Sequence, residues 1–298
     1  MLNSVLLKLK ESGQSIWIDY ISRSLIEHGA LQNMIDSGLL GMTSNPTIFE
    51  QALSSGIEYD LAISSLAYTG KSTFEIYDDL TVKDVQDAAD MFMPVYDKTD
   101  GLDGYVSLEV NPKLAYDTGE SIKEARRLYQ KVNRANVMFK IPSTPQGIEA
   151  IEELVSSGIN INATLIFSLK QYADVAQAYI KGISRLVKSR KDVSRVSSVA
   201  SIFVSRIDTK VDKELDEILP NIIQSANKEK IDSLRGKAAV ANCSLIYEKF
   251  QGILSEPSFK KLENKGANIQ RVLWASTSTK NPSYSDIKYV SELIKRIQ

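Results

Sequence analysis

The chain has 298 residues, which is long for one domain, although α/β barrels reach this length around a single core. Lys and Arg total 36 against 37 Asp and Glu. The chain therefore has no global field that would attract nucleic acid or an anionic membrane surface, and any anionic ligand must be held by local groups.

The histidine and cysteine counts exclude whole classes of metal site. His28 is the only histidine and Cys243 the only cysteine. Multi-histidine sites and thiolate zinc clusters cannot be built from them, so we expect no metal site of these kinds. A lone cysteine forms no intramolecular disulfide, which fits a reducing, cytoplasmic compartment. His28 follows a charged helical stretch and is expected in solvent.

The first 15 residues place Leu2, Val5, Leu6 and Leu9 at helical spacing. Charged residues interrupt them before a signal-like apolar segment develops, so we expect a covering helix. No apolar run in the sequence is long enough to span a bilayer, and we expect a soluble protein.

Further along the chain, short β-rich runs alternate with amphipathic stretches, which predicts βα units around a parallel sheet. We predict a single (β/α)8 barrel over residues 1–298, with extra helices in the long segment 47–103 between the second and third strands. The eight predicted strands are SIWIDY from Ser15, GMTSNP from Gly41, GYVSLEV from Gly104, VMFKIP from Val137, INATLIF from Ile161, VASIFVS from Val199, GKAAVAN from Gly236 and RVLWAST from Arg271.

Two acidic residues lie near strand ends, where barrel enzymes place their chemistry. Asp19 is near the end of the first predicted strand, and Glu109 is near the end of the third. Both are candidates for proton transfer, as would be needed in a reaction in which an amine forms an imine and a C–C bond is then cleaved. The residues alone leave two alternatives open: Asp19 as the cap of a helix that begins near Ser22, and Glu109 as a salt-bridge partner.

Lys140 lies in the fourth predicted strand between Phe139 and Ile141. Strand alternation puts it on the face opposite to these neighbours, so it points into the barrel if they pack against helices. Burial disfavours an ammonium group and favours the neutral, nucleophilic amine that a Schiff base requires. A structural lysine paired with a carboxylate, or one that extends outward to solvent, is the alternative.

Three neutral polar residues interrupt the second and fifth predicted strands: Asn45, Asn162 and Thr164. Asn162 and Thr164 share a strand face, so they are suited to orienting substrate hydroxyls or a catalytic water. Asn45 precedes Pro46, and an Asn-Pro pair is also a common turn opener.

Candidate phosphate ligands follow the later strands. Arg206 lies at a predicted helix N-terminus after the sixth strand, where a guanidinium and backbone N–H groups suit a phosphate, and Ser201 in that strand adds a hydroxyl. Strict alternation puts these two residues on opposite faces, so Arg206 must lie past the strand. A solvated arginine is the alternative. After the last predicted strand, the run STSTKNPS carries Ser276 and Lys280.

Taken together, these segments resemble transaldolase, in particular its longer bacterial form, over nearly the whole chain. The segments are SIWIDYISR, TSNPTIFEQAL, SLEVNP, VMFKIPSTPQGIEAIEEL, GININATLIFSLKQYADVAQAYIKG, ASIFVSRID and LWASTSTKNPSYSD. The resemblance implies a barrel of the class I aldolase type that moves dihydroxyacetone from sedoheptulose 7-phosphate to glyceraldehyde 3-phosphate. The products are erythrose 4-phosphate and fructose 6-phosphate, in the non-oxidative pentose phosphate pathway. The implied partners are sugar phosphates, and the chain is expected to be a monomer or a homodimer. No metal or organic cofactor is implied, because the imine of the lysine accepts the electrons.

The resemblance also assigns roles to the catalytic candidates. Lys140 matches the Schiff-base lysine, Glu109 and Asp19 match the carboxylates that handle protons, and Thr164 matches a residue that helps to hold the catalytic water. For substrate binding, the matching positions are Asn45, Asn162, Ser201 and Arg206.

Two departures from the family pattern stand out. Shorter transaldolases carry a second phosphate-binding arginine and a serine after the seventh strand, where GKAAVANCS offers Ala239 and Ala241; Lys280 is the leading substitute. Longer forms also continue beyond the position of Gln298, so the site is expected to be more open to water. Two alternatives to the transferase stay open: an aldolase that releases free dihydroxyacetone, and a barrel that binds sugar phosphate without chemistry.

Overall fold

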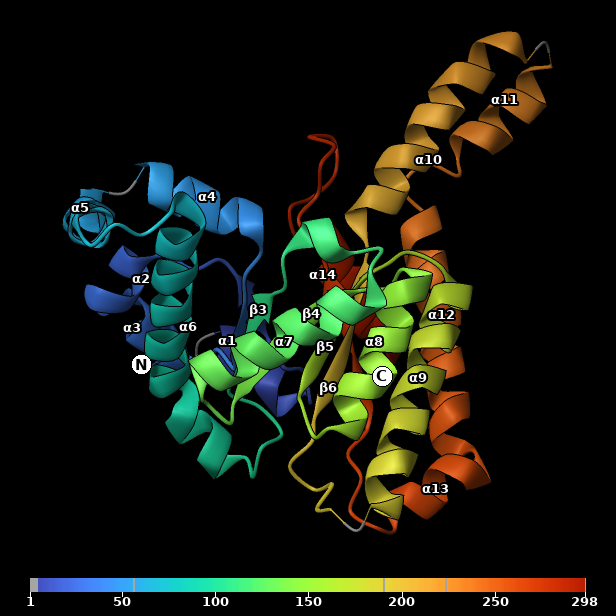
Figure 1. Cartoon of the computed structure of the whole chain (residues 1–298). Helices are drawn as coiled ribbons and strands as arrows, with labels where there is room; N and C mark the ends of the chain where they lie inside the picture. Colours follow the sequence, from blue (N-terminus) through green and yellow to red (C-terminus); the bar gives the residue numbers. More distant parts are fainter. Residues whose placement is uncertain (1–4, 56, 190, 223, 298) are drawn as a thin grey trace. The chain divides into compact units, whose positions relative to one another are not determined.

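The computed structural model describes residues 5–55, 57–189, 191–222 and 224–297 (Figure 1). By its internal contacts the chain divides into two compact units. The first comprises residues 1–162 and 195–197, and the second comprises residues 163–194 and 198–298. Five of the candidate residues, Asp19, Asn45, Glu109, Lys140 and Asn162, belong to the first unit, and four, Thr164, Ser201, Arg206 and Lys280, belong to the second.

The sheet of the first unit contains four parallel strands followed by the start of a fifth. Their register aligns Asp19 with Thr43, Thr43 with Ser107, and Glu109 with Lys140. Because side chains alternate along a strand, these five residues lie on one face of the sheet. The strands are β1 (Trp17–Asp19), β2 (Gly41–Thr43), β3 (Tyr105–Glu109), β4 (Val137–Pro142) and β5 (Ile161–Ile166).

Helices of the first unit begin at identifiable caps. The Ser22 hydroxyl accepts a hydrogen bond from Leu25 N at the start of α2, and Ser72 forms a capping box with Glu75 at the start of α6. α6 contacts β3, and α7 contacts β4 and α8. The helices are α1 (Val5–Glu11), α2 (Arg23–Glu27), α3 (Ala30–Asp36), α4 (Pro46–Ser55), η1 (Ile57–Tyr59), α5 (Asp60–Tyr68), α6 (Thr73–Lys98), η2 (Pro112–Leu114), α7 (Thr118–Val132) and α8 (Pro145–Ser156).

Four of these helices, α4, η1, α5 and α6, occupy the long segment between β2 and β3. A buried polar contact joins this segment to α2: the Tyr59 hydroxyl donates to Asp84 Oδ2 at 2.7 Å, and Arg23 donates to Asp84 Oδ1 at 2.8 Å. Asp84 is buried, and these donors satisfy its carboxylate.

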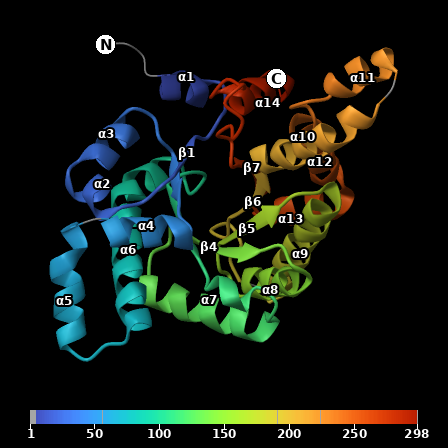
Figure 2. The ribbon, with the colours of Figure 1, turned by 90° about the horizontal axis from the view of Figure 1, so that it is seen from above.

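The second unit contains the end of β5, then β6 (Ser198–Phe203) and β7 (Gln270–Ala275), which pair in parallel. Helix α12 contacts α9, α10, α13 and α14. Helix α11 lies beside the outer part of α10, and the two project together from this unit (Figures 1 and 2). The helices are α9 (Leu169–Lys188), α10 (Ser205–Ile218), η3 (Leu219–Asn221), α11 (Ser225–Asp232), α12 (Ala238–Ser255), α13 (Pro257–Glu263) and α14 (Lys288–Ile297).

The seventh predicted strand is wrong. The run GKAAVAN leads into helix α12, which begins at Ala238. Alanine has the highest intrinsic helix propensity, and the buried positions Ala239, Val240, Cys243 and Ile246 continue at helical spacing beyond the run. The described residues therefore contain seven strands, and the run predicted as the eighth strand is β7.

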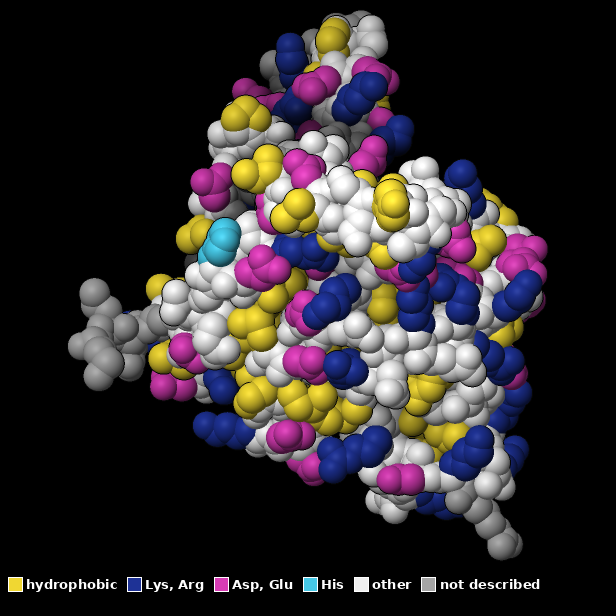
Figure 3. Space-filling view, turned by 60° about the vertical axis from the view of Figure 1, so that its left-hand side comes forward, with side chains coloured by type: hydrophobic (Ala, Val, Ile, Leu, Met, Phe, Trp, Pro, Cys, Tyr) yellow, Lys and Arg dark blue, Asp and Glu magenta, His cyan; other side chains and the backbone are white. Residues whose placement is uncertain are grey.

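Two surface expectations can be compared with the structure. His28 is exposed and is the C-cap residue of α2, as predicted. On the face shown in Figure 3, basic and acidic side chains are interspersed rather than gathered by sign.

Within the described ranges, none of the helices combines the length and the apolar character that crossing a bilayer requires.

Candidate active site

Lys140 is a buried lysine on β4, with 6% of its surface exposed. Its neighbours Phe139 and Ile141 are buried on the opposite face, as strand alternation predicts. The side-chain nitrogen Nζ donates a hydrogen bond to the backbone carbonyl of Ser44 at 2.8 Å and lies 3.5 Å from Glu109 Oε2. The alternative that this side chain extends outward to solvent is wrong.

Glu109 is largely buried beside Lys140. Burial raises the pKa of the Glu109 carboxyl; the charge and hydrogen bond of Lys140 oppose this rise, and the negative charge of Asp19 adds to it. Burial and the charge of Glu109 also raise the pKa of Tyr77, on α6, to about 12. Glu109 therefore holds its proton to higher pH than an ordinary glutamate, which suits a group that donates and recovers protons.

Asp19 is exposed at the end of β1. It does not cap the following helix, because Ser22 fills that position; the helix-cap alternative is therefore wrong. Beside Asp19 in the register lies Thr43, whose buried hydroxyl has no hydrogen-bond partner among the described residues. A buried hydroxyl without a partner is unusual, and a bound substrate hydroxyl or water would satisfy it.

A chain of hydrogen bonds runs from Lys140 to Asn162 through two serines. Ser44 accepts from Lys140 at its carbonyl and donates from its hydroxyl to the carbonyl of Ser107 at 2.7 Å. Asn162 then donates from Nδ2 to the hydroxyl of Ser107 at 3.0 Å. All four residues are buried. The sequence prediction missed Ser44, although it lies between buried Met42 and the candidate Asn45.

Asn45 opens a helix. Its side-chain oxygen accepts from Ile48 N at 3.0 Å, and its carbonyl accepts from Phe49 N, which together start α4. The turn-opening role that the Asn-Pro pair suggested is therefore present. The capping bond uses only the amide oxygen, so it does not occupy the amide nitrogen of this half-buried residue.

In the second unit, Thr164 on β5 and Ser201 on β6 are buried. Arg206 lies past the strand, in the first turn of α10, as alternation required. It is exposed, and its guanidinium lies 5.4 Å from the centre of the Phe203 ring. Lys280 is also exposed, and its Nζ donates to the Ser278 hydroxyl at 2.9 Å.

The loop after β7 is joined to the start of α10, next to Arg206. The hydroxyls of Ser205 and Ser276 lie 3.0 Å apart, and Ser205 N donates to the carbonyl of Ser276 at 3.1 Å. Ser276 has a φ of 55°, an uncommon value for a residue other than glycine. The loop after β7 therefore contacts the N-terminus of α10, next to Arg206.

Comparisons with known proteins show the family of the chain. A family model described as transaldolase/fructose-6-phosphate aldolase matches residues 16–296. The chain belongs to this family. A transaldolase of Trichodesmium erythraeum is 46% identical over 99% of this chain and 78% of its own length. Transaldolase 2 of Nostoc punctiforme is 42% identical over 99% and 78%, and a transaldolase of Saccharopolyspora erythraea is 44% identical over 98% and 77%. The family resemblance seen in the sequence is confirmed.

The structure changes the local context of one departure noted in the sequence. Ala239 and Ala241 do not follow a seventh strand, because both lie in α12; Ala239 N donates to Asp208 Oδ1 at 2.7 Å. The residues that follow the seventh strand are those of STSTKNPS. Lys280, the leading substitute for the second phosphate-binding arginine, lies in this loop.

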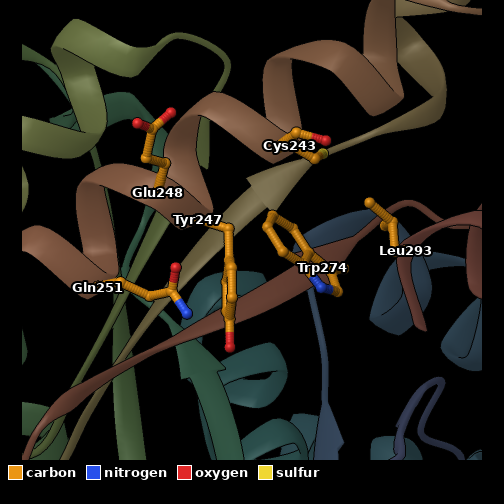
Figure 4. Close-up of a pocket in the computed structure, with 7 residues that line it drawn as sticks. Cys243, Tyr247, Glu248, Gln251, Trp274 and Leu293 are labelled. Carbon is orange, nitrogen blue, oxygen red and sulfur yellow. The ribbon is translucent and has the colours of Figure 1, made fainter. Parts of the chain in front are cut away.

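Two cavities in the second unit bear on these assignments. Lys280 borders a cavity of about 270 Å³ that is also lined by Asp208, Asp212, Lys213 and Asp216 of α10, so both signs of charge line it. A smaller cavity of about 150 Å³ lies beside α12 and includes Tyr247 and Trp274, but no candidate residue (Figure 4).

Proposed function

We propose that the chain is a transaldolase that carries a dihydroxyacetone unit as a Schiff base on Lys140. The observation that carries the proposal is the buried Lys140 amine, 3.5 Å from a carboxyl group whose pKa is raised by burial. Family membership supports the same reaction. The proposed donor is sedoheptulose 7-phosphate and the proposed acceptor is glyceraldehyde 3-phosphate.

The reaction begins when the lone pair of the neutral Lys140 amine forms a bond to the ketose carbonyl carbon. One amine proton passes to the carbonyl oxygen, which gives a carbinolamine. Glu109 donates a second proton to this hydroxyl, water leaves, and the protonated imine keeps one N–H. Covalent capture in this way divides one difficult step into easier ones.

C–C cleavage requires a base and an electron sink. A carboxylate, which we assign to Asp19, takes the proton of the hydroxyl beside the bond that breaks. The bonding electrons move into the imine to give an enamine, and the aldose product leaves. The enamine carbon then attacks the aldehyde of the acceptor, and hydrolysis of the new imine releases the product ketose and free Lys140. No further cofactor is needed, because the imine itself accepts the electrons.

The binding assignments belong to the same proposal. Asn45 and Asn162 bind substrate hydroxyls, and Thr164 helps to hold the catalytic water. Arg206 holds the phosphate with its guanidinium, at the positive end of the α10 dipole. Ser201 and Lys280 contribute to phosphate binding.

We also propose that residues 1–298 form one catalytic domain of the (β/α)8 barrel type. Parallel strands that follow one another in chain order, separated by helices, support this architecture. A cytoplasmic location and a monomeric or homodimeric state complete the proposal.

Borohydride trapping tests the proposed function. The protein is incubated with fructose 6-phosphate, reduced, and mapped by mass spectrometry; a reduced three-carbon adduct is expected on Lys140 and none in Lys140→Ala. Lys83→Ala, which removes an exposed lysine of α6, is the matched control and should form the adduct normally. A wild-type protein that forms no adduct contradicts the proposal.

A second measurement separates transfer from simple cleavage. Turnover of fructose 6-phosphate is compared with and without erythrose 4-phosphate as acceptor. A transaldolase is nearly silent without an acceptor, because its enamine waits for one. Rapid release of free dihydroxyacetone without an acceptor would instead identify an aldolase.

A further inference from the structure

Ser44 is the residue that binds the reactive nitrogen most closely. It follows the last residue of β2, and its carbonyl accepts a hydrogen bond from Lys140 Nζ at 2.8 Å, whereas the carboxylate of Glu109 is 3.5 Å away. Ser44 itself has no exposed surface. Water therefore does not compete for this carbonyl, and the contact with Lys140 is protected from solvent.

The side chain of Ser44 fixes that carbonyl in place. Its hydroxyl donates to the backbone carbonyl of Ser107, on the neighbouring strand, at 2.7 Å. On the other side, Asn45 and Pro46 turn the chain into α4. Ser44 thus lies at a strand-to-helix turn, one residue past the register pair of Thr43 with Ser107, and its hydroxyl attaches this turn to β3.

We propose that Ser44 is a catalytic residue of the Schiff-base steps, through its carbonyl, and that its hydroxyl positions that carbonyl. This inference rests on the proposed function. A neutral amine has two N–H groups and one lone pair. The hydrogen bond from one N–H to Ser44 restricts rotation of the amine about its bond to the side chain. Its lone pair therefore has fewer orientations, and attack on the ketose carbonyl begins from an amine that is already oriented.

The same carbonyl serves the next intermediate. After water leaves, the protonated imine carries a single N–H and a positive charge. A hydrogen bond from this N–H to the Ser44 carbonyl is charge-assisted, and such bonds are roughly twice as strong as neutral ones. The carbonyl therefore stabilises the imine more than it stabilises the free amine, which is the condition for accelerating its formation.

Ser44→Ala and Ser44→Thr test the proposal. Ser44→Ala removes the bond to Ser107 and leaves the carbonyl free to move, whereas Ser44→Thr keeps a hydroxyl. The rate of borohydride-trapped adduct formation with fructose 6-phosphate should fall on the order of tenfold in Ser44→Ala, the size expected for one charge-assisted hydrogen bond. The KM should change little, and Ser44→Thr should restore most of the rate.

Two further serines act as comparisons. Ser121 is also buried in the first unit and donates to the carbonyl of Leu114 at 2.8 Å, so Ser121→Ala removes an equivalent bond in α7 and should leave the trapping rate unchanged. Ser107→Ala keeps the carbonyl that accepts from Ser44 but loses the hydroxyl that accepts from Asn162. It should raise the KM more than it lowers the trapping rate.

The outcomes are distinct. If wild-type protein forms no adduct, the proposed function itself fails. If wild-type protein forms the adduct and Ser44→Ala forms it at the same rate, or Ser121→Ala slows it equally, only the role of Ser44 is overturned. Should Ser44→Ala not fold, Ser44→Cys replaces it, because a thiol is a weaker donor of similar size and should give an intermediate loss of rate.

Discussion

Tyr289 donates its hydroxyl to Asp208 Oδ2 at 2.9 Å, and this carboxylate is 1% exposed. The other oxygen of Asp208 accepts from Ala239 N at 2.7 Å. One turn later on α10, Asp212 makes the same pair of contacts, with Tyr284 at 2.6 Å and Gly236 N at 2.9 Å. Two buried carboxylates of α10 therefore connect the start of α12 to the C-terminal segment within the second unit.

Tyr289→Phe should destabilise the second unit through this contact. The substitution keeps the ring and leaves one oxygen of a buried carboxylate without its donor, at an expected cost of about 1.5–3 kcal/mol. Urea unfolding followed by circular dichroism measures the change. Tyr129→Phe is the control, because Tyr129 is 45% exposed. Equal stability of wild type and Tyr289→Phe would show that Asp208 does not depend on this hydroxyl.

Gly41 is needed because the ring of Trp17 lies directly above it. A Cβ at this position would meet ring atoms of Trp17 at 2.5 Å, too close for any real side chain. Gly41→Ala should therefore cost about 1–3 kcal/mol of unfolding free energy, as overpacking generally does. Gly252→Ala, in α12, meets nothing within 4 Å and should be neutral or slightly stabilising. Urea unfolding of both variants separates a steric cause from a general effect of replacing glycine.

The local pattern of a strand is enough to place Lys140, but not to identify every strand. In VMFKIP, one charged residue interrupts an apolar run of strand length, and alternation then determines which face it occupies. In GKAAVAN, the apolar run is short and rich in alanine, and a run of that kind fits a buried strand and a helix equally well. The residues that decide for helix, such as Cys243 and Ile246, lie beyond the run itself.

The roles of Ser44 and Ser107 could not be predicted for a different reason. The first bond brings the Ser44 hydroxyl to a carbonyl 63 residues away, and the second brings the Asn162 amide on β5 to the Ser107 hydroxyl on β3, 55 residues away. A single sequence carries no signal for such a pairing. Asp19 and Glu109 were recognisable because a carboxylate near a strand end is itself unusual, whereas a serine there is common.

Glu109 should give the adduct-forming step a pH dependence of definite sign. Burial raises the pKa of this carboxyl, so its protonated form, which donates the proton to the departing water, persists to higher pH than in an ordinary glutamate. The trapping rate should fall as the pH rises through that pKa. In Glu109→Gln this pH-dependent limb should disappear, and the rate should fall by about 10²–10⁴-fold. Glu120→Gln, at an exposed position of α7, should keep the wild-type profile.

Arg206 should determine the preference for phosphorylated substrates. It is exposed in the first turn of α10, where its guanidinium and the positive end of the helix dipole both favour an anion. Arg206→Ala should raise the KM for fructose 6-phosphate by about 10–100-fold, the cost of losing a hydrogen bond to a charged group. Capture of unphosphorylated dihydroxyacetone on Lys140 should be unaffected, because that ligand has no phosphate.

The control for Arg206 lies on the same helix. Lys210 is exposed and pairs with Glu214 at 3.1 Å, so Lys210→Ala removes a positive charge from α10 without touching its first turn. If both variants raise the KM equally, the effect comes from the general charge of the helix. If only Arg206→Ala does so, and only for phosphorylated ligands, the phosphate is held at the N-terminus of α10, because a long-range field would not distinguish positions one turn apart.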